Sequence, residues 1–155
     1  MIVQLYGIAF CMSVLFLMIL IILGQKQKVT NFLLLFMAIT ISNFGYYSIC
    51  TADSLKHAVN ANCFVYLGGV FVPILLFLSI AGLCQQPVGR LPLLSLLALA
   101  SVILYFVFRV GSGTEFYSRV ELVTRDGVSF LKKEYGSMHT LYPVFVFLCI
   151  CRPVW

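Results

Sequence analysis

The sequence predicts an all-α membrane protein: a bundle of four complete transmembrane helices plus a partial fifth, with an extracellular β-hairpin between helices 4 and 5. Hydrophobic residues make up 62% of the 155 residues and charged residues 10%, whereas a soluble domain carries about 25% charged residues. Four apolar runs approach or exceed the roughly 20 residues that a bilayer core requires. The acidic residues other than Asp53 gather in one polar segment, which contains an Asp-Gly turn signal.

The first predicted helix covers residues 2–24, and Lys26 and Lys28 follow it. No basic residue precedes the run and no A-x-A cleavage site follows it, so we interpret it as a retained helix and not a signal peptide. Because basic residues favour the cytoplasmic side, this order predicts an N-terminus outside the cell.

The second predicted helix covers residues 31–50. Three polar side chains lie in the middle of this span: Thr40, Ser42 and Asn43. Polar groups are costly in lipid, so we expect these side chains to face other helices.

The third predicted helix covers residues 58–83 and follows a polar loop at 51–57. Within it, Gly68 and Gly69 predict a close approach of another helix, and Pro73 predicts a kink, because proline removes one helical hydrogen bond. The fourth covers residues 91–108 and is closed by Arg109.

The polar segment at 116–135 predicts a β-hairpin around Asp126-Gly127. A two-residue turn there fixes the register of the strands. The expected pairs are Arg125 with Val128, Val123 with Phe130, Leu122 with Leu131, Glu121 with Lys132, and Arg119 with Glu134. Because an isolated hairpin is marginal in water, we expect it to lie over the helix ends. The side chains expected to turn inwards are Phe116, Val120, Leu122 and Leu131.

The fifth apolar run covers residues 138–151, and Arg152-Pro153 interrupts it. As a helix its 14 residues would span about 21 Å, which is less than the bilayer core of about 30 Å. We therefore expect an incomplete fifth helix and a native protein longer than this chain.

The motifs of common enzymes are missing from the sequence, so we expect no catalytic residues and no cofactor. The two histidines, His57 and His139, do not make a metal site. No cluster of basic residues suits nucleic acid. None of the six cysteines forms a CxxC pair, and whether Cys50 and Cys63 pair in an oxidising compartment stays open.

Two stretches resemble a known family. Residues 60–73, NANCFVYLGGVFVP, resemble a third-helix pattern in which tyrosine, glycine and proline follow a polar start. Residues 116–142, FYSRVELVTRDGVSFLKKEYGSMHTLY, resemble the hairpin and following helix start of the same family. That family is the seven-transmembrane N-terminal sensory region of bacterial histidine kinases, with relatives fused to GGDEF-type diguanylate cyclases. The family has seven helices, so helices six and seven and an output domain are missing from this chain.

The resemblance implies a sensory input domain in the cytoplasmic membrane of a bacterium. It would couple an extracellular or membrane stimulus to a kinase or cyclase, with membrane lipid, a small-molecule ligand and a second copy as partners. Six residues near the outer face are candidate ligand contacts: Asn62, Tyr66, Arg109, Glu115, Tyr135 and His139. For His139 the alternative is a helix-end residue bonded to neighbouring backbone. A transporter or channel fragment, or a small standalone membrane protein, remains the alternative function.

Overall fold

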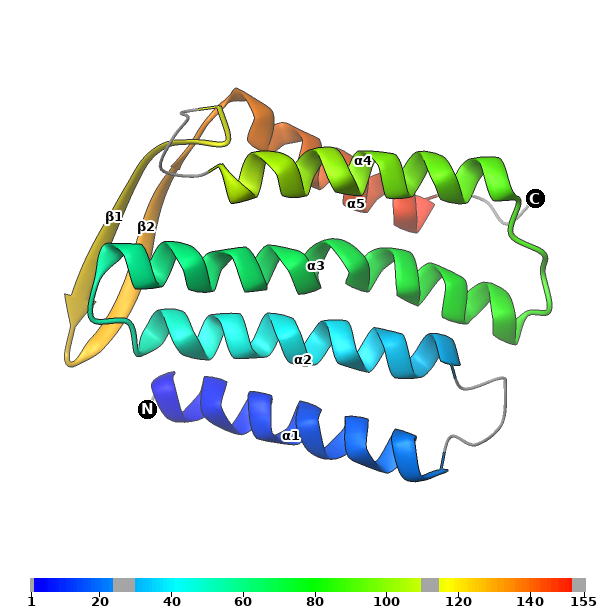
Figure 1. Ribbon diagram of the computed structural model, residues 1–155, viewed down its shortest axis with the longest axis horizontal. Helices are drawn as coiled ribbons and strands as arrows, with labels where there is room; N and C mark the ends of the chain where they lie inside the picture. The colour runs from blue at the N-terminus through cyan, green and yellow to red at the C-terminus, as the bar shows by residue number, and fades with distance from the viewer. Residues whose placement is uncertain (1, 24–29, 110–114, 152–155) are drawn as a thin grey trace.

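The computed structural model describes residues 2–23, 30–109 and 115–151. Within these ranges, four helices are long and apolar enough to cross a membrane. The elements, in chain order, are α1 (Ile2–Leu23), α2 (Thr30–Cys50), α3 (Leu55–Leu83), α4 (Arg90–Phe108), β1 (Tyr117–Arg125), β2 (Val128–Tyr135), the 3₁₀ helix η2 (Ser137–Thr140) and α5 (Leu141–Cys151). The helices lie side by side, and the hairpin crosses the end of the bundle at which α3 begins (Figure 1).

Close packing of α2 on α3 depends on two glycines. A Cβ at Gly68 would overlap the carbonyl oxygen of Ala38, and a Cβ at Gly45 would come within 2.6 Å of the backbone nitrogen of Val65. Both positions therefore require glycine for the backbones to meet. At Gly69, in contrast, an added Cβ meets only the hydroxyl of Tyr142, at 3.2 Å. Of the two glycines singled out in α3, Gly68 is thus the one that α2 packs against.

The polar side chains of α2 take two kinds of partner. Ser42 Oγ donates to the carbonyl of Val65 in α3 at 3.3 Å, and Asn43 Nδ2 donates to the carbonyl of Ala9 in α1 at 3.4 Å. These two contacts confirm that Ser42 and Asn43 face other helices. For Thr40 the expectation stays a prediction, since its hydroxyl donates to the carbonyl of Phe36, one turn earlier in α2.

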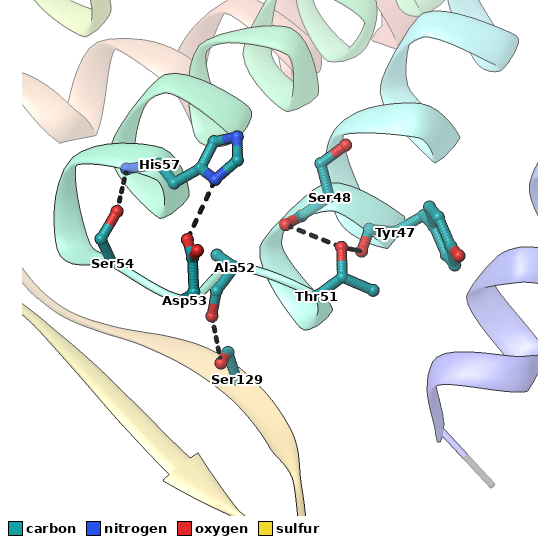
Figure 2. Close-up of polar contacts among 8 residues, drawn as sticks. All are labelled: Tyr47, Ser48, Thr51, Ala52, Asp53, Ser54, His57 and Ser129. Atoms are coloured by element: carbon teal, nitrogen blue, oxygen red, sulfur yellow. Dashed lines mark hydrogen bonds and ion pairs between the residues drawn. The ribbon is translucent and has the colours of Figure 1, made fainter.

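Helix α3 begins at Leu55, three residues before the sequence-based boundary. The side chain of Ser54 caps it by accepting the His57 backbone N–H at 3.3 Å (Figure 2), which satisfies a donor that the first turn leaves free. Residues 55–57 therefore belong to the helix and not to the loop. The helix then continues through Pro73 without interruption to Leu83.

The hairpin has the expected register from its turn as far as the pair Arg119 with Glu134. Asp126 (φ 52°) and Gly127 (φ 73°) both have positive φ, as a type I′ turn requires. Beyond Arg119 the register shifts, so that Tyr117 pairs with Tyr135. The expected positions of Arg119 opposite Glu134 and of Glu121 opposite Lys132 are confirmed, and Arg119 forms an ion pair with Glu121 on its own strand, at 2.6 Å.

The main apolar core joins α3, α4, α5 and the start of the hairpin. Its buried members are Tyr66, Val70, Ile74, Leu96, Ala100, Ile103, Val107, Phe116, Tyr117, Phe145 and Cys149. Of the residues expected to turn inwards, Phe116 is buried, Val120 packs on this core and Leu131 packs on a smaller cluster between α2 and α3. Cys50 and Cys63 are both free thiols. The loop at 24–29 with its two lysines and the chain after Cys151 lie outside the described residues.

Candidate functional site beneath the hairpin

Lys133 projects from β2 towards the beginning of α3. Its Nζ donates to Oδ1 of Asn62 at 2.6 Å, and Asn62 is 1% exposed. The same ammonium lies 5.7 Å from the ring centroid of Tyr66 and 5.4 Å from that of Tyr117. Aromatic faces attract a cation at such distances, so two rings and one amide oxygen offset part of the cost of burying this charge.

A chain of hydroxyl contacts runs beside the lysine. The hydroxyl of Tyr117 in β1 donates to that of Tyr66 in α3 at 2.7 Å. The Tyr66 oxygen lies 3.3 Å from Nε2 of His139 in η2. Asn62, Tyr66, Tyr117, Lys133 and His139, here called the hairpin junction, therefore tie α3 to both strands and to the segment that leads into α5.

Aromatic rings enclose the imidazole of His139. The ring of Tyr135 stacks on it with centroids 3.9 Å apart, and those of Phe116 and Tyr117 lie 5.3 Å and 6.1 Å away. Tyr142, at the start of α5, lies 6.5 Å away and packs edge-on against Tyr66. The imidazole thus contacts Tyr66 and Tyr117, the two tyrosines whose rings lie beside the ammonium of Lys133.

Burial sets the electrostatics of the hairpin junction. It lowers the pKa of Lys133 from 10.5 to about 8, and it raises the pKa of Tyr117, so the phenol stays protonated. Burial, reinforced by the charge of Lys133, also lowers the pKa of His139, which lies in η2 outside the four long spans. Within the described residues, neither Lys133 nor His139 has a salt bridge to a carboxylate.

A second contact holds the hairpin near its turn. Ser129 Oγ donates to the carbonyl of Ala52, in the loop between α2 and α3, at 2.6 Å (Figure 2). Both residues are buried. Next to them, at the start of α3, the exposed Asp53 accepts a hydrogen bond from His57, and this bond is the main cause of the lowered pKa of Asp53. The hairpin is therefore attached to the bundle at two points along its length.

The structure brings together four of the six candidate ligand residues. Asn62, Tyr66 and His139 belong to the hairpin junction, and Tyr135 covers its histidine. Arg109 is exposed, donating to the hydroxyl of Tyr105 one turn earlier in α4 at 2.9 Å. Glu115 is also exposed, and its carbonyl accepts the backbone N–H of Met138 at 2.9 Å. Neither the bond from Arg109 to Tyr105 nor the bond to the Glu115 carbonyl reaches the hairpin junction.

Sequence reasoning missed Lys133 and Tyr117, although the register contained a signal for the lysine. Residues opposite each other on two strands share a face, and Lys133 pairs with Val120, which was expected to turn inwards. A lysine on the buried face of a hairpin needs a polar partner, and Asn62 is the polar residue that it reaches. For Tyr117 the register shift between Tyr117 and Arg119 had no signal in the sequence.

A separate apolar groove of about 420 Å³ lies among α2, α3 and α4, away from the hairpin. Its lining residues are Leu34, Met37, Ala38, Ile41, Leu67, Phe71, Ile74, Leu75, Leu78, Leu93 and Leu97. All of these side chains are apolar. The groove therefore suits hydrocarbon and has no side chain that would bind a polar group.

One comparison with known proteins gives a match. The family model described as the N-terminal 7TM region of histidine kinase matches residues 7–152. Neither the curated proteins nor the solved structures contain a match. The matched range includes the four long helices, the hairpin and α5.

Proposed function

Because the chain belongs to the family of N-terminal 7TM regions of histidine kinases, we propose that it is a sensory input domain acting through the hairpin junction. The family and the four long apolar helices make it a multi-pass membrane protein of sensory type. The proposal adds that a stimulus on the hairpin side changes the junction, and that the helices carry this change across the membrane to a kinase or diguanylate cyclase.

The observation that carries this proposal is the convergence of α3, β1, β2 and η2 on one set of polar contacts. Asn62 and Tyr66 belong to α3, which runs from the hairpin to the opposite end of the bundle (Figure 1). His139 lies in η2, which directly precedes α5, and α5 extends in the same direction as α3 (Figure 1). A stimulus that breaks or strengthens these contacts changes how α3 and α5 are held together, and it shifts the balance between two helix arrangements.

The proposed domain also has an orientation in the membrane and a set of partners. The hairpin side faces the cell exterior and the membrane is the bacterial cytoplasmic membrane, supported by the basic residues after the first helix. Residues 1–155 act as one sensory domain. Lipid covers the exposed apolar side chains of α1, and the other partners are a second copy of the receptor and the kinase or cyclase that gives the output. A small molecule is the alternative stimulus to the one inferred below.

A distance measurement between the far ends of two helices tests the coupling. Cys84 follows α3 and Cys151 ends α5, and both are exposed, so both accept spin labels once the other cysteines are alanine. The full chain in lipid nanodiscs is compared with Asn62→Ala, which breaks the junction, and with Lys132→Met, which removes an exposed neighbouring charge. We expect Asn62→Ala alone to change the distance distribution. An unchanged distribution would contradict the proposal.

A further inference from the structure

We propose that the stimulus at the hairpin junction is the proton: acidification protonates Nε2 of His139 and releases η2, and with it the hairpin, from α3. The inference rests on the proposed function and deepens it by naming what the sensory domain detects. It stands on the direction of the hydrogen bonds around Tyr66 and on the charges beside His139.

The hydrogen bonds at Tyr66 have one consistent direction. Tyr117 donates its hydroxyl hydrogen to the oxygen of Tyr66. The hydrogen of Tyr66 is then free to be donated, and the atom that it meets is Nε2 of His139, 3.3 Å away. A nitrogen accepts a hydrogen bond only when it carries no proton. We therefore assign the closed junction a neutral imidazole with its proton on Nδ1, the tautomer that gives the hydrogen of Tyr66 an acceptor.

Protonation of Nε2 reverses one of these bonds. The imidazolium N–H must donate, and the oxygen of Tyr66 that it faces already accepts from Tyr117. If that oxygen accepts both bonds, the hydrogen of the buried Tyr66 side chain loses its acceptor. An unsatisfied buried polar group is unfavourable, so the proton on His139 opposes the contact that joins η2 to α3.

Charge adds to this effect. Lys133 lies close enough to His139 to disfavour the imidazolium. The titratable groups that face the imidazole from the elements around it are Tyr66 of α3, Tyr117 of β1, Lys133 and Tyr135 of β2, and Tyr142 of α5, while Tyr46 of α2 interacts with Tyr135 and Tyr142. Among the described residues this set contains no carboxylate. Two cations would thus share an apolar site without a counter-charge.

Closure of the hairpin junction should be favoured at higher pH. The closed junction lowers the pKa of His139 below its ordinary 6.5, so the open state binds the proton more tightly. Closure is fully favoured above pH 6.5 and is lost as the pH falls through the lowered pKa. For each pKa unit by which closure lowers the pKa of His139, the ratio of open to closed hairpin rises about tenfold as the pH falls from 6.5 to the lowered pKa.

The test measures hairpin position against pH in the full chain. Spin labels on Thr124 near the hairpin turn and on Ser101 of α4, both exposed, report the distance between them in nanodiscs frozen at pH values from about 7.5 to about 5, the range in which histidine titrates. We expect a second, broader distance population to grow as the pH falls. His139→Gln should abolish this growth, because an amide accepts the Tyr66 hydroxyl and does not titrate in this range.

The second histidine provides a matched control. His57→Gln removes the exposed histidine that bonds Asp53, and it should leave the pH response intact. If His139→Gln fails to fold, Tyr66→Phe removes the bond that protonation reverses, and the response should shrink. A pH response that is absent from the unaltered chain, retained in His139→Gln, or unchanged in Tyr66→Phe would overturn the inference.

This failure is distinguishable from failure of the sensory proposal. If pH leaves the hairpin in place while Asn62→Ala still changes the distance between Cys84 and Cys151, the sensory proposal stands and the stimulus is not the proton. If neither pH nor Asn62→Ala has an effect, both proposals fail.

Discussion

Tyr142 at the start of α5 donates its hydroxyl to the carbonyl oxygen of Gly69 in α3, at 3.4 Å. Gly69 lies four residues before Pro73, so its carbonyl is the one that proline leaves without the usual helical donor. A tyrosine from another helix thus replaces the missing backbone N–H. Within a membrane such replacement makes a proline tolerable in a helix that continues past it.

Replacing Tyr142 with Phe should destabilise the bundle by about 0.6 kcal/mol, the typical value for an interhelical hydrogen bond. In a Pro73→Ala background, residue 73 supplies its own N–H to Gly69, so the same replacement should have a smaller effect. Reversible unfolding in mixed micelles measures both. Equal effects in the two backgrounds would show that Tyr142 does not substitute for the missing donor.

The two adjacent glycines of α3 should differ in their tolerance of alanine. Gly68→Ala introduces a methyl group that overlaps the backbone of α2, and we expect a loss of about 1–3 kcal/mol. The methyl group of Gly69→Ala meets only the Tyr142 hydroxyl, so this variant should lose less stability. The free energy of unfolding of the two variants decides this, and similar values would contradict the close α2–α3 contact at Gly68.

Gly127→Val should disrupt the hairpin turn. Gly127 has φ of 73°, a region that a β-branched residue adopts only with strain. Asp126→Asn is the matched control, because asparagine tolerates positive φ at the preceding position. Limited proteolysis should cut the segment 117–135 faster in the valine variant alone. Equal rates in the two variants would count against the type I′ turn.

As the pH is raised from about 8, hairpin docking should first become stronger and then, above about pH 10, weaker. The pKa of Lys133 falls from 10.5 to about 8 on burial, so the docked state gains stability as the pH rises from 8 to 10.5. Tyr117 has the opposite effect. Because docking raises the pKa of its phenol, docking weakens once the pH exceeds 10, the ordinary pKa of a tyrosine. The label pair on Thr124 and Ser101 should therefore show the smallest open population near about pH 10. Lys133→Met should remove the rise between 8 and 10.

Much of the fold follows from hydropathy and turn chemistry. The apolar runs predict the helices because a bilayer leaves few alternatives, and Asp126-Gly127 predicts a register that holds as far as Arg119. The N-terminus of α3 was placed too late because the boundary followed polarity, whereas the Ser54 cap decides it. Thr40 differs from Ser42 because its hydroxyl bonds the backbone of its own helix.

The hairpin junction was only partly predictable. Asn62, Tyr66 and His139 stood out as polar or aromatic residues near helix ends, but their joining needs the angle at which the hairpin crosses α3. Lys133 could be placed on the inner face by its pairing with Val120. Its contact with Asn62 depends on tertiary packing, which periodicity does not encode. Arg109 and Glu115 are close in sequence to the hairpin, yet their side chains are exposed.

The most direct test of the central claim, that Lys133 and Asn62 hold the hairpin on α3, is amide hydrogen exchange of β1 and β2 in nanodiscs. An undocked hairpin is marginally stable in water, so its protection reports docking. Either substitution, Asn62→Ala or Lys133→Met, leaves the remaining partner without its hydrogen bond in a buried place, at a cost of about 1–3 kcal/mol. Asn62→Ala and Lys133→Met should therefore each reduce protection by roughly tenfold, while Lys132→Met should not. Equal protection in all three variants would contradict the account.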